Sequence, residues 1–302
     1  MSKTKAWLNA ARLRTLPLSL SGIIVGTALA GFYGYINYAI FVLALMTTIG
    51  FQVTSNFAND YGDGVKGTDN EDRVGPKRAL QSGLLTREEL KFGIVFSIII
   101  NVLLVLVLVF VAFGIQNYGY VILFLVLGAA SIWAAIKYTV GTSAYGYRGL
   151  GDLFVFLFFG LLGVLGCMFL YTKFITADSL LPAITIGLLS VGVLNLNNLR
   201  DSLSDKKVGK NTLVVQMGYQ NGKRYHYILL LLAFFTMGGF ILVNFVNWTS
   251  TIPLLGFVPI FVHMRKVSVT QDHILLDPEL KKLALSTFLL AVLFYFSFNI
   301  FS

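Results

Sequence analysis

"FGIVFSIIINVLLVLVLVFVAFG", residues 92–114, is a segment of 23 residues without a charged side chain. A helix rises about 1.5 Å per residue, so about 20 apolar residues are enough to cross the hydrocarbon core of a bilayer. A stretch this long and this apolar predicts a membrane-spanning helix.

The same apolar character recurs along the chain. Of all residues, 56% are hydrophobic and 12% are charged, whereas a soluble domain carries about 25% charged residues. Nine spanning helices are expected, roughly at residues 16–33, 38–59, 92–114, 118–139, 151–171, 180–199, 226–246, 249–264 and 283–301. The sequence therefore predicts an all-α, multi-span membrane protein that forms a single domain over residues 1–302.

The basic residues fall on one side of this nine-helix arrangement. Every Lys and Arg except Lys173 lies in the N-terminal segment or in a loop that follows an even-numbered span. Because positively charged loops stay in the cytoplasm, we expect the N-terminus and these loops inside the cell and the C-terminus outside. The net charge of +9 is thus a topology signal. Nucleic acid is not expected as a partner, since it would need a soluble basic face with stacking aromatics.

The acidic residues show the same bias, with only Asp178 on the other side. The positive-inside rule says little about acids, so this bias needs another cause. One group lies in "NFANDYGDGVKGTDNEDRVGPKRALQSG", residues 56–83. There Asp60 and Asp63 are three residues apart, with Asn56 about one turn earlier, and this spacing places side chains on one face of a helix.

A second group ends the sixth span as the first ends the second span. It lies in "LNLNNLRDSLSDKKVGKNT", residues 194–212, where Asp201 and Asp205 are four residues apart. Asn197 precedes them by one turn, and Asn198 lies beside it. The match indicates a duplicated four-helix unit, spans 1–4 and 5–8 (roughly residues 12–139 and 148–264), with a ninth helix, 283–301, added.

Stacked carboxylates of this kind suit a metal ion and a phosphate ligand. They repel each other unless a cation lies between them, and Mg²⁺ combines one or two carboxylates with substrate phosphates. Asp69 can reach back from the glycine-rich loop of the first group, whereas Glu71 and Asp72 are interpreted as ordinary loop charges. Basic residues near both groups can contact phosphate oxygens: Lys66, Lys77, Arg78, Arg200, Lys206 and Lys210. A single acidic group is more often a solvated loop, but two matching groups favour a metal–diphosphate site.

At this point two stretches, "NDYGDGVKGTD" (59–69) and "NNLRDSLSDKKVGKNTL" (197–213), resemble the aspartate-rich motifs of the UbiA superfamily of intramembrane prenyltransferases. Three further stretches are similar to the branch of that superfamily that prenylates 1,4-dihydroxy-2-naphthoate in menaquinone biosynthesis. They are "ARLRTLPLSLSGIIVGTALA" (11–30), "RVGPKRALQSGLLT" (73–86) and "AYGYRGLGDLFVFLFFGLLGVLG" (144–166). The resemblance extends through the sixth span and the loop after it, while spans 7 to 9 add only hydrophobicity.

The resemblance implies an enzyme of the bacterial cell membrane that joins a polyprenyl diphosphate to 1,4-dihydroxy-2-naphthoate, releasing CO₂ and diphosphate and giving a demethylmenaquinone. It implies Mg²⁺ as the cofactor, with the metal ligands Asp60, Asp63, Asp69, Asp201 and Asp205, all but Asp69 also catalytic. The residues that it implies for substrate binding are Arg12, Asn56, Asn59, Lys66, Lys77, Arg78, Arg148, Asn198, Arg200 and Lys206.

Arg148 starts the fifth span, as Arg12 and Arg14 precede the first. We expect Arg148 to bind the carboxylate of the aromatic acid or a phosphate, with Asp152 as its partner. The competing interpretation is that all three arginines serve membrane topology alone.

Two other functions are weighed against this one. A related enzyme could use another aromatic acceptor such as 4-hydroxybenzoate, but Leu194 and Asn197 stand where that branch usually has an aspartate and a tyrosine. A secondary transporter would place ionisable residues near the bilayer midplane, where this chain has almost none. The prenyl chain length does not follow from the sequence.

The remaining polar residues are given no chemistry. His226, His263 and His273 lack metal-binding spacing and are expected at the interface or in loops. "DPELKK", residues 277–282, is interpreted as a helix start before the ninth span. Cys167 is expected to be a buried packing residue.

Overall fold

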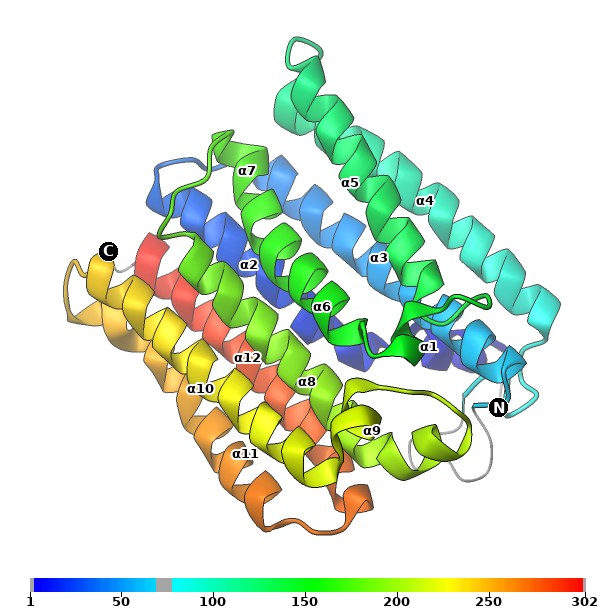
Figure 1. The fold of residues 1–302 in the computed structure, drawn as a ribbon. Helices are drawn as coiled ribbons and strands as arrows, with labels where there is room; N and C mark the ends of the chain where they lie inside the picture. Colours follow the sequence, from blue (N-terminus) through cyan, green and yellow to red (C-terminus); the bar gives the residue numbers. More distant parts are fainter. Residues whose placement is uncertain (1–2, 69–77, 301–302) are drawn as a thin grey trace.

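The computed structural model describes residues 3–68 and 78–300. Within these residues every regular element is a helix, and nine helical segments are long and apolar enough to cross a membrane. Helices suit this environment because they satisfy their own backbone hydrogen bonds where water is absent. The segments pack as one elongated bundle, with the first helix and the end of the last at opposite ends (Figure 1). The prediction of an all-α protein with nine spans is confirmed.

The bounds of the spans differ in detail from those expected. The nine segments are α1 (Lys3–Ala11) with α2 (Leu16–Phe32); α3 (Tyr38–Val65); α4 (Arg87–Phe113); α5 (Tyr118–Lys137); α6 (Gly151–Val155) with η3 (Phe156–Gly166) and α7 (Cys167–Thr172); α8 (Leu180–Lys207); α10 (Tyr219–Val243); η4 (Trp248–Gly256) with α11 (Phe257–Val269); and η5 (His273–Leu276) with α12 (Asp277–Asn299). The short helix α9 (Leu213–Met217) lies between α8 and α10. Both α3 and α8 continue past the expected spans, so the paired aspartates lie on helices. The duplication of spans 1–4 and 5–8 stays a prediction.

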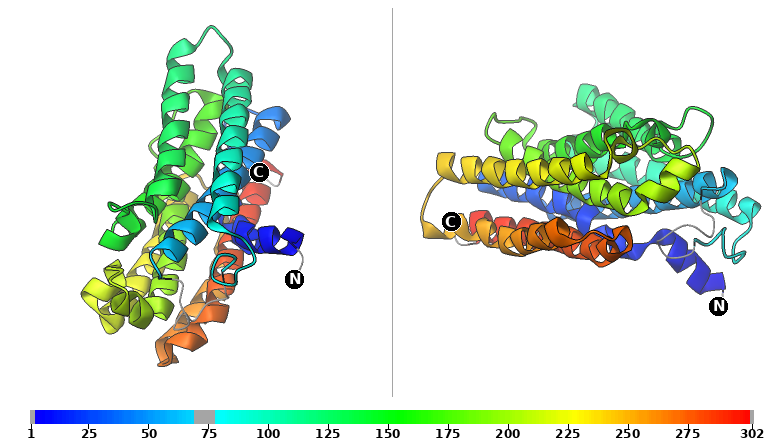
Figure 2. Two further views of the ribbon diagram at one scale, coloured as in Figure 1. Left: turned by 90° about the vertical axis from the view of Figure 1, so that its right-hand side faces the viewer. Right: turned by 60° about the horizontal axis from the view of Figure 1, so that its bottom comes forward.

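Burial is uneven across the bundle. Helices α4 and α5 form a hairpin at one side (Figures 1 and 2). Most residues in their apolar central stretches are not covered by other parts of the protein. Large apolar side chains such as Phe92, Phe96 and Ile122 are exposed on this hairpin. By contrast α8 is largely enclosed, because it packs against η3, α10 and α12. Exposed apolar side chains on a hairpin of this hydropathy indicate a surface that faces lipid.

Two hydrophobic cores share α2. One joins α2 to η3, α8, α10 and α12, and Leu29, Ile186 and Phe240 belong to it. The other joins α2 to α3, α4, α5 and α7, and it includes Leu108 and Phe113. Since both cores contact α2, this helix ties the two sides of the bundle together.

The middle of the fifth span is a π-helix, η3, where the sequence predicts a regular α-helix. Such segments are rare and often occur at functional sites. Its neighbours approach closely at glycines. A Cβ on Gly26 of α2 would lie 2.4 Å from the carbonyl oxygen of Val164, and one on Gly160 would lie 2.6 Å from the Cα of Gly187 on α8. Small residues permit this backbone contact between membrane helices, and so η3 is held between α2 and α8.

We predict that Gly26→Val lowers the free energy of unfolding by about 1–3 kcal/mol, the usual cost of overpacking, because its side chain meets the backbone of η3. Gly238→Val on α10 is the control, since a Cβ there meets nothing within 4 Å. Thermal unfolding in detergent measures the difference. Equal transition temperatures for the two variants would contradict the packing described for η3.

Candidate active site

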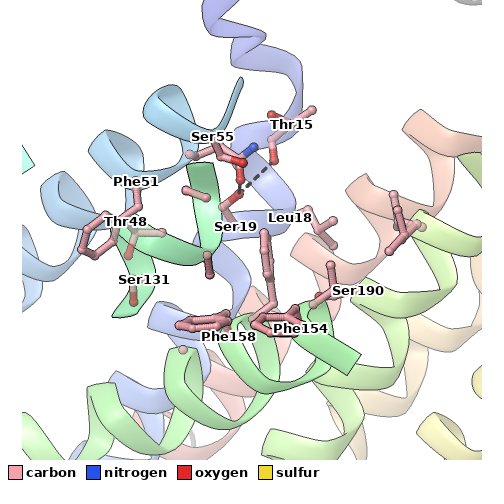
Figure 3. Close-up of a pocket in the computed structure, with 18 of the residues that line it drawn as sticks. Thr15, Leu18, Ser19, Thr48, Phe51, Ser55, Ser131, Phe154, Phe158 and Ser190 are labelled. Carbon is pink, nitrogen blue, oxygen red and sulfur yellow. Dashed lines mark hydrogen bonds between the residues drawn. The ribbon is translucent and has the colours of Figure 1, made fainter. Parts of the chain in front are cut away.

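A cavity of about 900 Å³ runs between the helices. At the end of the bundle that carries the paired aspartates, hereafter the polar end, its lining includes Arg12, Asn59, Asp63, Arg78, Arg200 and Lys210. Deeper in the bundle the lining is mostly apolar, with a few hydroxyl side chains, and Figure 3 shows Phe154 and Phe158 on one wall with Phe51 and Thr48 on another. The cavity is therefore charged at one end and mostly apolar along the rest.

The first aspartate pair is buried at the end of α3. Asp60 accepts from the Arg12 guanidinium, and Nη1 of Arg78 lies 3.5 Å from the same Oδ1 atom of Asp60. Oδ1 of Asp63 accepts a hydrogen bond of 2.8 Å from the Tyr147 hydroxyl. Arg12 lies between α1 and α2, while Arg78 follows α3 in the chain, so two segments neutralise Asp60.

The second pair is buried at the end of α8. Arg200 donates to both carboxylate oxygens of Asp201, at 2.8 and 2.6 Å, and to Asp277 at the start of α12, at 2.5 Å. Nζ of Lys210 lies 3.7 Å from Oδ1 of Asp205. The other oxygen of Asp205, Oδ2, is buried and has no hydrogen-bond partner. Asp205 is therefore only half satisfied by the protein.

Lys210 and Tyr147 bring the two pairs together. Burial disfavours the charged form of Lys210, but the carboxylates of Asp63 and Asp205 outweigh this effect and raise the pKa of Lys210. The Tyr147 ring lies under the ammonium groups of Lys66 and Lys210, at 3.9 and 5.6 Å from its centroid. Burial, followed by the charge of Asp63, raises the pKa of Tyr147, so its hydroxyl stays protonated and donates to Asp63.

The loop between α5 and α6 holds Tyr147 in place. The backbone N–H of Asn211, just after the second aspartate pair, donates to the Tyr147 carbonyl at 3.2 Å. The Thr68 hydroxyl, just after the first pair, lies 2.5 Å from the Tyr147 hydroxyl. Sequence reasoning missed Tyr147, although it stands next to Arg148. Nothing in the sequence separates it from the other tyrosines, since its role depends on contacts with distant segments.

The structure sorts the sequence-based site residues into four groups. Those that line the cavity are Arg12, Asn59, Asp63, Arg78 and Arg200. Those that are buried behind its lining are Asn56, Asp60, Asn198, Asp201 and Asp205. Those that are exposed and outside the lining are Lys66, Arg148 and Lys206. Asp69 and Lys77 lie outside the described residues. The ligand and catalytic roles of all these residues stay predictions.

Two sequence-based contacts take a different form. Asn56 donates to the carbonyl oxygen of Ala11 at 2.8 Å, so it anchors the end of α1 rather than facing the cavity. Arg148 and Asp152 do not pair among the ion pairs of the described residues. Asp152 instead lies beside the side chain of Tyr225 on α10. The four-residue spacing between Arg148 and Asp152 does not predict an ion pair here, because the chain turns between the two residues.

The last three spans contribute more than hydrophobicity. His226 and His263 are fully buried, with their Nε2 atoms 3.0 Å apart, and Nδ1 of His263 lies 2.8 Å from Oε2 of Glu279. Neither histidine lies in a loop, because α10, α11 and α12 pack together around them; their position at the membrane interface stays a prediction. Asp277, assigned no chemistry from sequence, lines the cavity and pairs with Arg200.

The polar end fits a divalent cation by its chemistry. It offers carboxylate oxygens, the donors that Mg²⁺ prefers, and Oδ2 of Asp205 is buried without a partner. Within residues 3–68 and 78–300, however, no three acidic, His or Cys side chains stand close enough to hold a metal as placed. The carboxylates contact arginine, lysine and tyrosine instead. A cation would therefore enter a site whose acids already have protein partners.

The family model for the UbiA prenyltransferase family matches residues 19–285, and the chain belongs to this family. The 1,4-dihydroxy-2-naphthoate octaprenyltransferase of Haemophilus influenzae is 43% identical over 97% of this chain and 95% of that protein. The protein of the same name from Escherichia coli is 42% identical over 97% and 95%.

Solved structures show the same fold. A UbiA homologue from Archaeoglobus fulgidus bound to GPP and Mg²⁺ superposes with a TM-score of 0.69 and 11% sequence identity, covering 98% of this chain and 100% of that one. The fold class and the family resemblance inferred from the aspartate-rich motifs are thus confirmed.

Proposed function

We propose that the protein transfers a polyprenyl group from polyprenyl diphosphate to 1,4-dihydroxy-2-naphthoate, with loss of CO₂ and diphosphate, giving a demethylmenaquinone in its reduced, quinol form. The observation that carries the proposal is the cavity, which is lined by Asp63 and by arginines at the end where both aspartate pairs lie and is mostly apolar along the rest. A ligand with an anionic head and a long isoprenoid tail has this polarity. The relatives of 43% and 42% identity support the choice of acceptor.

The diphosphate head would bind at the polar end. Arg12, Arg78 and Arg200 line the cavity there, and guanidinium groups bind phosphate oxygens through paired hydrogen bonds. These arginines pair with aspartates in the structure, so the diphosphate and the aspartates would bind the same guanidinium groups. The charge developing on the leaving diphosphate falls among groups that are already in place, which is how preorganised sites lower a barrier.

Mg²⁺ is the cofactor that we propose for this end. The residues that would hold it are Asp60, Asp63, Asp201 and Asp205, of which Asp205 has an unpartnered, buried oxygen. When bound, it would supply positive charge that makes the diphosphate a better leaving group. The protein's own contribution is to place cations beside these carboxylates: Arg12 and Arg78 at Asp60, Arg200 at Asp201 and Lys210 at Asp205.

The apolar part of the cavity would hold the prenyl tail and exclude water. Loss of diphosphate leaves an electron-poor allylic carbon, which water would trap. Phe154, Phe158 and Leu162 line the adjoining wall. The ring of Tyr145 stacks on Phe154 with centroids 4.0 Å apart, so flat aromatic surfaces lie beside the polar end. A dry wall of this kind favours attack by the aromatic acceptor over hydrolysis.

The reaction balances without loss of a ring proton to a base. The allylic C–O bond breaks and its electron pair leaves with diphosphate. The ring carbon that bears the carboxylate forms the new C–C bond, and the bond to the carboxylate then breaks to release CO₂ and restore the aromatic ring. The residues need only orient the ring and hold the anions.

The protein would work in the bacterial cell membrane with its polar end in the cytoplasm. The basic residues gather in segments joined to this end, as the positive-inside rule requires. Water-soluble diphosphate would then be released inside the cell.

We predict that purified protein in lipid vesicles, given Mg²⁺ and a polyprenyl diphosphate, prenylates 1,4-dihydroxy-2-naphthoate in preference to other aromatic acids. A panel containing 4-hydroxybenzoate, analysed by mass spectrometry, checks this preference. A product from 4-hydroxybenzoate alone would move the protein to another branch of the family. Metal-dependent flux with no covalent product would point to transport.

We predict that Asp63→Asn and Asp205→Asn each lower kcat/KM by about 100-fold or more, the scale seen when a group that stabilises developing charge is removed. Asp178→Asn, at the opposite end of the bundle, makes the same change in charge and should stay near the activity of the unmodified protein. Full activity in both site variants would rule out roles for these carboxylates.

We predict that Lys173→Cys reacts with a membrane-impermeant maleimide in intact cells, whereas Lys266→Cys reacts only after the membrane is opened. Cys167 is buried, so it gives little background. The opposite labelling pattern would invert the proposed orientation.

A further inference from the structure

Lys210 stands between the two aspartate pairs and is nearly enclosed by protein. Its Nζ atom lies 3.7 Å from Oδ1 of Asp205, and it interacts electrostatically with Asp63 of the other pair. It is also fixed at its backbone, where its N–H donates to the Asp205 carbonyl at 2.8 Å. One ammonium thus faces a carboxylate from α3 and a carboxylate from α8.

The other aspartates are matched differently. Asp60 has two arginine partners, and Asp201 binds Arg200 through both carboxylate oxygens. Lys210 is the cation that interacts with both Asp63 and Asp205. Asp63 also accepts a hydrogen bond from the neutral hydroxyl of Tyr147. Oδ2 of Asp205 lacks a partner and is buried. Among the four paired aspartates, the ion pairs with arginine involve Asp60 and Asp201, whereas the ion pair of Lys210 involves Asp205.

Lys210 also lines the cavity. Its four-carbon side chain can swing while its backbone stays anchored, because the ammonium is a flexible point charge. A divalent cation and an ammonium cannot both lie against the same two carboxylates without strong repulsion, since like charges a few ångströms apart repel strongly where water does not screen them. A diphosphate in the cavity would offer the ammonium a new anion.

We propose that Lys210 is an internal counter-ion, which occupies the place between Asp63 and Asp205 when no divalent cation is bound and moves to the diphosphate when cation and substrate bind. Lys210 therefore opposes binding of the cation alone and favours binding of the cation together with diphosphate. This keeps the metal site weak until the substrate arrives. The proposal rests on the metal–diphosphate site proposed above, but not on the identity of the aromatic acceptor.

The test measures two affinities with the full-length protein in detergent. Mn²⁺ binding without any diphosphate, followed by electron paramagnetic resonance of the free ion, should become about tenfold tighter in Lys210→Met, because a competing positive charge is gone. Binding of inorganic pyrophosphate in the presence of Mg²⁺, followed by calorimetry, should become about tenfold weaker, because a phosphate contact is lost. The two changes have opposite signs.

Two further variants separate charge from shape. Lys210→Arg keeps the positive charge and should bind Mn²⁺ within about twofold of the unmodified protein. Lys207→Met removes an exposed charge from the same segment and should change neither affinity by more than about twofold, since exposed charges are screened. If Lys210→Met does not fold, Lys210→Gln takes its place under the same criteria.

Unchanged or weaker Mn²⁺ binding in the neutral variant would overturn the proposal, because a purely structural lysine or a simple phosphate ligand predicts that result. Unchanged pyrophosphate binding would overturn the transfer to diphosphate. Neither measurement contains a prenyl group or an aromatic acid. Failure of the acceptor panel therefore leaves this proposal standing, and failure here leaves prenyl transfer standing.

Discussion

Four carboxylates gathered at one end of a membrane bundle repel each other, and the fold depends on the basic side chains that offset this repulsion. Two carboxylates a few ångströms apart cost several kcal/mol in a partly buried place. Arg12, Arg78, Arg200 and Lys210 supply the positive charge. They come from four segments of the chain, so the segment between α1 and α2, the turn before α4, helix α8 and the loop after α8 are brought together in one place.

This gathering of charge sets the shape of the cavity. Because lipid cannot solvate the charged groups, they lie where the helix ends meet, and the apolar side chains below them face either lipid or the cavity. The cavity is lined in part by residues of the second core, among them Ile23, Leu108 and Leu170. The π-helix η3, seated on Gly26 and Gly187, turns Phe158 toward this space. A single site thus offers a charged environment suited to the head of an amphipathic ligand and an apolar environment suited to its tail.

Long-range contacts explain what the sequence could not show. Tyr147 contacts Asp63, more than eighty positions earlier in the chain, through a loop without helical periodicity. His263 contacts His226 and Glu279 from separate helices, and each looks like an ordinary interfacial residue when considered alone. Asp277 resembles a helix-start residue, and only the packing of α12 beside α8 brings it to Arg200. Periodicity reveals which face a residue shares with its near neighbours, not which distant segment covers that face.

The sequence by itself determined the nine apolar spans, the gathering of charge on one side and the two aspartate pairs, because length, hydropathy and helical spacing are local properties. The matching of each acid with its cation was decided only by the tertiary structure. So were the π-helical fifth span and the place of Lys210 between Asp63 and Asp205. An electrostatic partner is chosen by distance in space, and that distance exists only after the helices have packed.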